Sequence, residues 1–137
     1  MEIISRSDAD LSFPPSDFFP SVPATAWEAH RQYLGSDGNL HPNAGCFALR
    51  SAGRTIMVDT GYGPSLTGRL FDEMEAKGVR VDEVTAVTFT HLHPDHVGWN
   101  MIAEGGNSRP AFPNARYLVP RGCYELSVCH PFCGAVS

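Results

Sequence analysis

Three imidazoles and a carboxylate occur within six residues of the chain, in the stretch HLHPDH from residue 91 to 96. Neutral imidazole and carboxylate are ligands that suit Zn²⁺, with Fe and Mn as lesser options. A strand end followed by a proline-restrained turn can aim His91 and His93 at one point, while Asp95 and His96 turn toward a neighbouring point. The spacing therefore predicts a site for one or two divalent cations.

A second interpretation of these residues needs no metal. Histidines are frequent in exposed loops, and an aspartate such as Asp95 is a common N-cap for the helix that follows it. The two interpretations can both hold for Asp95. Two histidines that lie upstream of this stretch, His30 and His41, are predicted to be structural or exposed.

Three β-rich runs would position the histidine stretch. Residues 46–50 and 54–59 are separated by the turn 51–53, which predicts a hairpin closed by a short glycine-containing turn. Residues 84–90 are nearly continuous in β-branched and apolar side chains, as expected for a strand that is covered on both faces. His91 would then follow directly after the end of this strand.

Helical patterns alternate with the strands. Leu66, Leu70 and Met74 recur every four residues and predict a helix over 65–77, with Gly78 as its C-terminal stop. Downstream, the sequence favours two further elements, a short helix over 95–103 and a strand over 115–119. The alternation of strands and helices predicts an α/β fold.

The first 44 residues have a different character. Four prolines in residues 11–23 exclude a helix or a central strand there, so we expect an ordered arm held by Phe13, Phe18 and Phe19. A short helix is predicted over 25–34, with Trp27 and His30 on neighbouring positions of one face. We therefore divide the chain into an N-terminal arm with a short helix (1–44), a partial domain (45–121) and an unpatterned tail (122–137).

Composition excludes several classes of protein. The 137 residues carry a net charge of −5 without a block of like charge, so nothing favours binding to nucleic acid or to an anionic membrane. No apolar run approaches membrane-spanning length, and Asp8 and Asp10 stand where a signal peptide needs its apolar stretch, so the expected location is cytoplasmic. The four cysteines are expected to be reduced thiols, with Cys46 as a small core residue.

The histidine motif also carries a family resemblance. His91-x-His93-x-Asp95-His96, preceded by an apolar strand and by the turn Val58-Asp59-Thr60-Gly61, resembles the metallo-β-lactamase superfamily. The sequence THLHPDHVGWN, from residue 90 to 100, most resembles that of lactonase and esterase-like members. The resemblance covers about residues 45–119.

The resemblance implies which residues would bind metal. In that family the first two histidines help hold one metal and the aspartate and third histidine help hold a second, so His91 and His93 would serve one site and Asp95 and His96 the other. Asp59 matches a strand-end aspartate that orients a ligand without binding the metal itself. Its alternative role is that of a turn-forming aspartate. The implied cofactor is zinc, as one or two ions.

The activity that the resemblance implies is metal-assisted hydrolysis of a small molecule. A bound metal lowers the pKa of water from about 15.7 to about 7 and polarises a substrate carbonyl. Asp95 could additionally take or relay a proton as a catalytic residue. A flavodiiron-type oxygen reductase would have glutamate at position 93, so His93 disfavours that branch. A lactone, an ester or a related carbonyl compound is the expected substrate.

The family completes its sites with a further histidine, a bridging aspartate and a last histidine, which lie downstream. After His96 this chain offers only His130 and no aspartate. His130 could substitute as a ligand, or could form a separate site with three cysteines, Cys123, Cys129 and Cys133, although that spacing matches no recognised zinc knuckle.

The length also bears on the fold that the resemblance implies. The family's fold is a four-layer αβ/βα sandwich of two similar halves, and this chain is long enough for about the N-terminal one. A lone half would leave one face of its sheet uncovered, which favours a homodimer through that face. We thus expect a hydrolase that is truncated and inactive alone, and the alternative is a non-catalytic remnant that binds metal or a partner.

Overall fold

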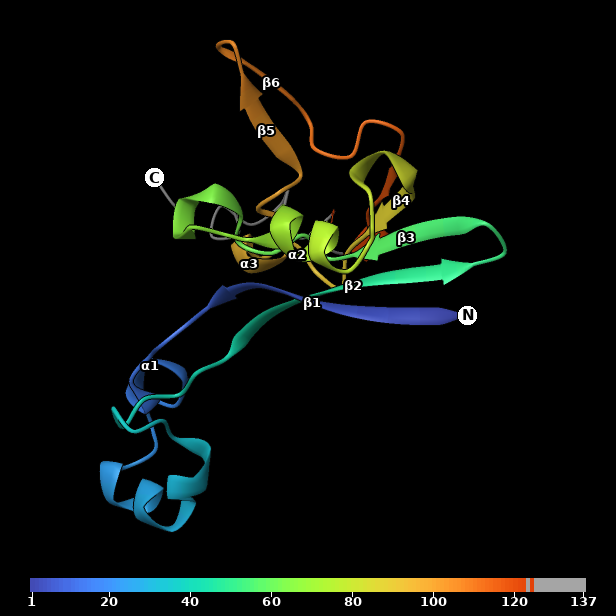
Figure 1. The fold of residues 1–137 in the computed structure, drawn as a ribbon. Helices are drawn as coiled ribbons and strands as arrows, with labels where there is room; N and C mark the ends of the chain where they lie inside the picture. Colours follow the sequence, from blue (N-terminus) through green and yellow to red (C-terminus); the bar gives the residue numbers. More distant parts are fainter. Residues whose placement is uncertain (123, 125–137) are drawn as a thin grey trace. The chain divides into compact units, whose positions relative to one another are not determined.

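The computed structural model describes residues 1–122 and residue 124 (Figure 1). The chain forms two compact units. One comprises residues 1–9 together with the chain from residue 44 onward, and the other comprises residues 10–43. Among the described residues, no helix is both long and apolar enough to cross a membrane.

A five-stranded mixed sheet forms the centre of the larger unit. Its strands follow the order β1-β2-β3-β4-β7. Strands β2 and β3 are antiparallel, whereas β3 runs parallel to β4 and β4 runs parallel to β7. The strands are β1 (Glu2–Asp10), β2 (Asn43–Ser51), β3 (Arg54–Val58), β4 (Val84–Thr88) and β7 (Arg116–Leu118).

The predicted hairpin between β2 and β3 is confirmed. Ser51 pairs with Arg54 at its closed end. The two residues between them, Ala52 and Gly53, both have positive φ, at 49° and 73°. A two-residue turn of this hand matches the twist of the strands, which is why the glycine in the sequence is a useful signal.

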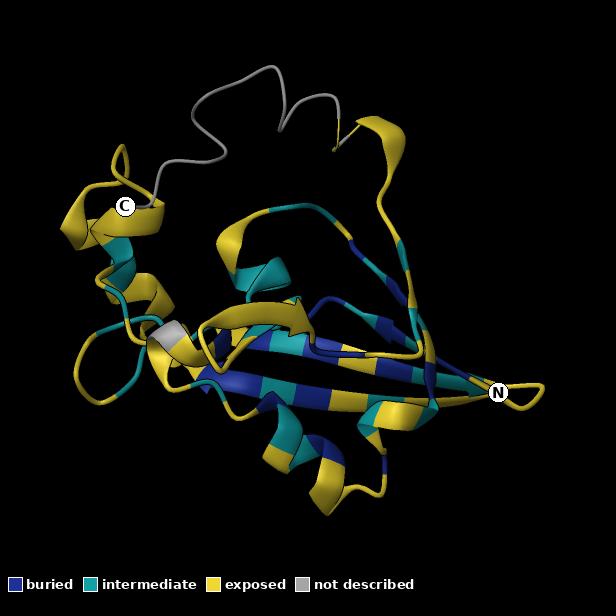
Figure 2. Ribbon diagram, turned by 90° about the horizontal axis from the view of Figure 1, so that it is seen from above, coloured by how far each residue is buried: buried dark blue, intermediate teal, exposed yellow. Residues whose placement is uncertain are grey.

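One face of the sheet is covered by helix α2 (Leu70–Ala76). Leu70 and Met74 are fully buried and belong to the same hydrophobic cluster as Met57 and Val87 of the sheet. Full burial of a side chain of this size contributes roughly 1.5–3 kcal/mol. Figure 2 shows that buried residues concentrate along the strands.

The other face of the sheet is open in the described part of the chain. Phe47 is 42% exposed and Leu118 is 46% exposed. A shallow hollow of about 350 Å³ lies on this face, lined by Arg54, Ile56, Thr85, Ala86, Arg116 and Leu118. The prediction that β4 is covered on both faces was therefore wrong, because Thr85 is exposed. A homodimer through this face stays a prediction.

The helix predicted over 65–77 begins later than expected. A 3-10 turn, η2 (Gly63–Leu66), comes first, and Thr67 then adopts left-handed φ of 54°. Helix α2 starts only at Leu70, whose N–H donates to the Asp8 carboxylate at 2.9 Å. Gly78, with φ of 67°, ends the helical segment as predicted.

The helix predicted over 95–103 is also shorter. Helix α3 (Pro94–Val97) is followed by a separate two-stranded hairpin, β5 (Met101–Glu104) and β6 (Asn107–Pro110). Gly105 and Gly106 form its turn with positive φ. The strand predicted over 115–119 is confirmed as β7, and a 3-10 turn, η3 (Val81–Glu83), leads into β4.

Strand β1 was not predicted. Its inward residues include Arg6 and Asp8, which are 2% and 0% exposed, so the strand lacks the alternation of apolar and polar residues that marks a half-buried strand. Because these two charged side chains lie on the covered face, the strand has no apolar and polar alternation by which the sequence could predict it.

Residues 10–43 form a separate unit with no buried residue. Helix α1 (Pro15–Phe18) is followed by the 3-10 segment η1 (Ala24–Tyr33), which is interrupted at His30 by non-helical φ and ψ. The three phenylalanines expected to hold the arm make ring contacts: Phe13 and Phe18 lie 5.3 Å apart, and Phe19 lies 5.5 Å from Trp27, a contact that was not predicted. The helix predicted over 25–34 is thus a broken 3-10 segment.

Candidate metal centre

The HLHPDH stretch lies where two parallel strands of the sheet end. Strands β3 and β4 are followed by Asp59 and by the segment 89–96, and the N–H of Asp59 donates to the carbonyl of Thr88 at 2.9 Å. Carboxyl ends of parallel strands meet at one edge of a sheet, and this edge is where ligands bind in α/β folds. The topology therefore brings Asp59 next to the segment that carries the metal donors.

Three of the predicted donors converge. Ligand atoms of His91, Asp95 and His96 all lie within 4.8 Å of one another. The His91 and His96 rings have centroids 3.9 Å apart. His93 is outside this group of three, but its Nδ1 lies 3.1 Å from His91 Nε2. The other three residues of the motif therefore lie around His91.

Asp59 makes contacts that fix the orientation of this cluster. Its Oδ2 lies 2.9 Å from His96 Nδ1, and its two oxygens accept the N–H and the hydroxyl of Thr90, both at 2.8 Å. Asp59 is buried and has φ of 62°, a left-handed conformation that aspartate tolerates better than most residues. The carboxylate is thus held by three groups and touches one imidazole of the cluster.

Thr90 is a residue that sequence analysis missed. Its hydroxyl lies 3.1 Å from His91 Nδ1 and 3.2 Å from His96 Nδ1, in addition to its bond to Asp59. Nothing in the residue types marks it, because threonine is ordinary at the end of a strand. It connects the carboxylate to two imidazoles.

Tyr62 and His91 respond electrostatically to this environment. Burial, followed by the neighbouring His96 and His93, lowers the pKa of His91, which favours the neutral imidazole that a metal ligand must supply. Burial and the charge of Asp95 raise the pKa of Tyr62, so its phenol stays protonated at neutral pH. Tyr62 was not predicted as a neighbour of the cluster.

The backbone behind the cluster is tied to the Asp59 turn. The N–H of Thr60 donates to the His96 carbonyl at 2.8 Å, and the N–H of Gly98 donates to the Gly61 carbonyl at 2.7 Å. A Cβ on Gly98 would overlap the carbonyl group of Tyr62, so only glycine allows this approach. The loop is therefore held in place by main-chain hydrogen bonds as well as by side-chain contacts.

The donor set fits zinc. Two imidazoles and a carboxylate within reach of one point are borderline and hard donors of the kind that Zn²⁺ binds. The alternative role of Asp95 as an N-cap is wrong: His93 occupies the cap position of α3, and Asp95 lies in the first turn. Asp95 is therefore available to a ligand, with Oδ2 3.2 Å from His96 Nε2.

No cysteine belongs to the metal centre in the described part of the chain. Cys46 is a buried core residue, as predicted, and burial raises the pKa of its thiol to about 12. The predicted alternatives that use Cys123, Cys129, His130 and Cys133 lie outside the described residues.

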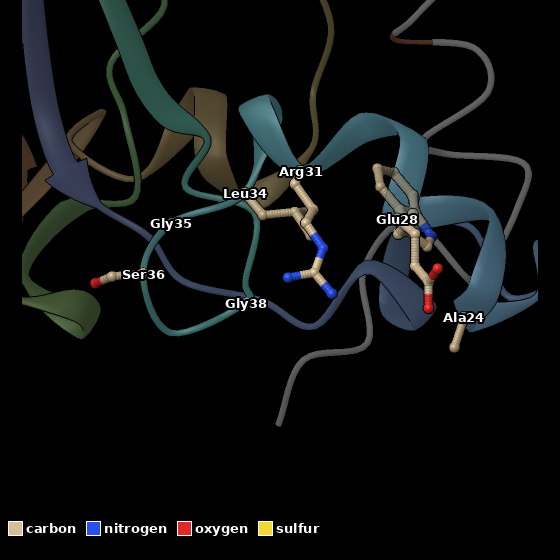
Figure 3. Close-up of a pocket in the computed structure, with 8 residues that line it drawn as sticks. Ala24, Glu28, Arg31, Leu34, Gly35, Ser36 and Gly38 are labelled. Atoms are coloured by element: carbon tan, nitrogen blue, oxygen red, sulfur yellow. The ribbon is translucent and has the colours of Figure 1, made fainter.

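A second hollow, of about 530 Å³, lies within residues 10–43. Figure 3 shows Glu28 and Arg31 beside it, with the lining completed by Ala24, Trp27, Leu34, Gly35, Ser36 and Gly38. The hollow contains no histidine, cysteine or aspartate. It offers no metal ligand set.

Comparison with known proteins agrees with this geometry. The family model of the metallo-beta-lactamase superfamily matches residues 43–103, which include the turn after β3 and the whole histidine motif. A mouse protein, "Metallo-beta-lactamase domain-containing protein 1", is 38% identical over 84 residues. Residues 43–103 therefore belong to the metallo-beta-lactamase superfamily. The fold of the chain is mixed α/β and corresponds to about half of a metallo-beta-lactamase chain.

Solved structures of the superfamily show how much of the fold is present. A probable metal-dependent hydrolase from Staphylococcus aureus matches with a TM-score of 0.75 at 15% identity, covering 96% of this chain and 50% of its own. AidC, a dizinc quorum-quenching lactonase, matches with a TM-score of 0.80 at 19% identity, covering 93% of this chain and 44% of its own. The match to the mouse protein covers 56% of this chain and 28% of that relative's length. The chain therefore spans about half or less of these superfamily members.

Proposed function

We propose that this chain is the metal-binding part of a zinc-dependent hydrolase that cleaves a lactone, an ester or a related carbonyl compound. The observation that carries the proposal is the convergence of His91, Asp95 and His96 ligand atoms within 4.8 Å at the end of two parallel strands. The similarity of the fold to a dizinc lactonase supports zinc and a lactone or ester substrate.

The four motif residues would hold the metal, with His91 and His93 at one ion and Asp95 and His96 at another. A bound zinc ion supplies Lewis-acid chemistry, which acidifies water and polarises a carbonyl group. Residues around the donors would keep them in place. Asp59 accepts from Thr90 and contacts His96 Nδ1, so the other ring nitrogen, Nε2, which lies beside the Asp95 carboxylate, would face the cation.

Asp95 is the proposed proton carrier. Its side chain is 35% exposed and lies in the first turn of α3, so it can reach a substrate that enters from solvent. A carboxylate has two oxygens, so one can bind a cation while the other accepts a proton. In this proposal Asp95 takes the proton of the attacking water and returns it to the leaving oxygen.

The decisive experiment measures metal and turnover together. We expect the purified protein to bind zinc stoichiometrically, and His91→Ala to lose that zinc while His30→Ala keeps it, because His30 lies in residues 10–43 and outside the donor group. Hydrolysis of p-nitrophenyl acetate and of N-acyl homoserine lactones tests the activity. Equal zinc in the parent and in His91→Ala would exclude the proposed site.

A non-catalytic metal-binding role is the competing function. It is favoured by the share of the superfamily fold that this chain spans, which is 50% and 44% of two solved members. Stoichiometric zinc that depends on His91, with no turnover of either substrate class, would support this role and exclude hydrolysis by the chain alone.

A further inference from the structure

Asp8, on β1, is a buried carboxylate that the proposed chemistry does not use. It is fully buried, with 0% exposure. Its Oδ2 accepts the N–H groups of Tyr62 at 2.8 Å and Gly63 at 3.1 Å, and its Oδ1 accepts the N–H of Leu70 at 2.9 Å and the indole N–H of Trp99 at 2.7 Å. Four donors from three separate parts of the chain therefore meet at one side chain.

The surrounding backbone leaves space for this carboxylate. A Cβ at Gly68 would lie 2.6 Å from Asp8 Oδ1, and a Cβ at Gly61 would overlap the Asp8 carboxylate. Gly61 also has left-handed φ of 65°. Two glycines thus let the loop wrap closely around Asp8, so the carboxylate acts as the fixed centre of residues 61–70.

The same loop holds the backbone of the metal-binding segment. The Gly61 carbonyl accepts from the N–H of Gly98 at 2.7 Å, and Thr60 donates its N–H to His96 and accepts from the N–H of Trp99 at 3.1 Å. The Trp99 side chain reaches Asp8 directly. Asp8 is therefore linked to the main chain of residues 96–99 by two routes, one through the loop and one through the indole.

We propose that Asp8 is a positioning residue for the metal centre. It fixes residues 61–63 and Trp99, and through them the backbone that carries His96, without touching the metal or the substrate. This inference rests on the proposed function in so far as the positioned residues bind metal. Its physical basis is that a buried carboxylate makes strong, directional bonds to N–H groups, whose loss would leave donors without an acceptor.

Asp8→Asn is the informative substitution because it preserves the size of the side chain. An asparagine has one accepting oxygen, and its NH₂ group would face two N–H donors whichever way it turns. We expect zinc affinity to fall by about 10–100-fold, as for other residues that support metal ligands. With Co²⁺ in place of zinc, the visible absorption of the bound ion should also change, because it reports ligand geometry.

A matched control separates positioning from stability. Met74→Ala removes a fully buried core side chain on α2 that has no hydrogen bond to the loop, so it should lower the thermal midpoint while leaving zinc affinity and the cobalt spectrum unchanged. Trp99→Phe removes only the indole N–H and should weaken zinc binding by a few-fold. If Asp8→Asn fails to fold, Trp99→Phe still tests the proposal.

Amide hydrogen exchange tests positioning in metal-free protein. Asp8→Asn should speed exchange at Gly98 and Trp99 more than Met74→Ala does at equal stability. Equal exchange in the two variants, or wild-type zinc affinity in Asp8→Asn, would overturn the role of Asp8. Absence of His91-dependent zinc in the parent protein would instead overturn the proposed function, and the exchange result would then decide the role of Asp8 by itself.

Discussion

Two carboxylate–imidazole pairs in this chain have the same separation and different surroundings. His96 Nδ1 lies 2.9 Å from Asp59 Oδ2 in the larger unit, and His41 Nε2 lies 2.9 Å from Asp37 Oδ1 in residues 10–43. The first two side chains are 21% and 4% exposed, whereas the second two are 49% and 45% exposed. Water therefore competes for one pair far more than for the other.

The contacts around each pair widen this difference. Asp59 is anchored by the backbone and the hydroxyl of Thr90, which itself reaches a second histidine of the cluster. Asp37 accepts from the N–H of Asn39 in its own exposed loop and from the hydroxyl of Ser12, which lies before helix α1. A short distance alone does not distinguish a functional pair, whereas burial and the connection to a second histidine do.

The largest expected effect comes from the backbone behind the buried pair. Gly98→Ala places a methyl group onto the carbonyl of Tyr62, a backbone atom that cannot rotate away. We expect the free energy of unfolding to fall by about 3 kcal/mol, the upper end for overpacking. Urea denaturation followed by circular dichroism measures the change.

A glycine of the exposed unit is the control for this substitution. Gly38 has φ of 77° and no atom within 4 Å of an added Cβ, so Gly38→Ala should cost only about 1 kcal/mol for the left-handed backbone. Similar losses in the two variants would mean that the backbone approach at Gly98 is not tight.

The second expected effect is on metal affinity. Asp59→Asn keeps the shape of the side chain but removes the charge that His96 and Thr90 contact. We expect the zinc dissociation constant to rise by about 10–100-fold, as when other carboxylates that orient metal ligands are lost. Competition with a chromogenic chelator measures it.

The exposed pair supplies the matched variant. Asp37→Asn removes an equally close carboxylate from an imidazole, yet neither residue belongs to the donor group. Its zinc affinity should equal that of the parent protein. A comparable loss in Asp37→Asn would contradict the distinction between the two pairs.

Local signals explain which parts of the fold the sequence predicted. The β2–β3 hairpin, the stop at Gly78 and strand β7 each depend on neighbouring residues, and all three were confirmed. The start of α2 depends on Asp8, more than sixty residues upstream, whose carboxylate accepts the Leu70 N–H. Contacts of this kind leave no local pattern, so the helix was predicted several residues too early.

The residues of the candidate site also divide into those that the sequence predicted and those that only the fold brings together. The donors were found because three histidines and an aspartate in six residues are unusual and chemically specific, and Asp59 followed from the family resemblance. Thr90, Tyr62 and Trp99 have ordinary types at ordinary positions. Their roles arise from contacts that the fold creates, such as the bond between Trp99 and Asp8.

A smaller effect is expected from the hydroxyl that connects the buried pair to His91. Thr90→Val removes the bond to Asp59 and the contacts to both imidazoles while preserving a β-branched side chain at the strand end. A single hydrogen bond to a charged group contributes about 1.5–3 kcal/mol, and the retained backbone bond reduces the loss. We expect zinc affinity to fall by about 10-fold, while Thr90→Ser should keep wild-type affinity.

The smallest expected effect concerns the exposed pair and its response to pH. The hydrogen bond from His41, followed by the N–H of Asn39, lowers the pKa of Asp37 to about 2 from the usual 3.8. Because the folded pKa is the lower one, the pair stabilises residues 10–43 fully above about pH 4, and this contribution is lost as the pH falls from 3.8 toward 2.

The substitution His41→Ala should raise the Asp37 pKa but leave it below 3.8, because the bonds from Asn39 and Ser12 remain. Carboxyl ¹³C shifts followed by NMR through this range give both values. An unchanged Asp37 pKa in His41→Ala would show that the bonds from Asn39 and Ser12 alone lower this pKa. The exposed pair would then resemble the buried one in distance only. In the buried pair, the Thr90 hydroxyl contacts both Asp59 and His96.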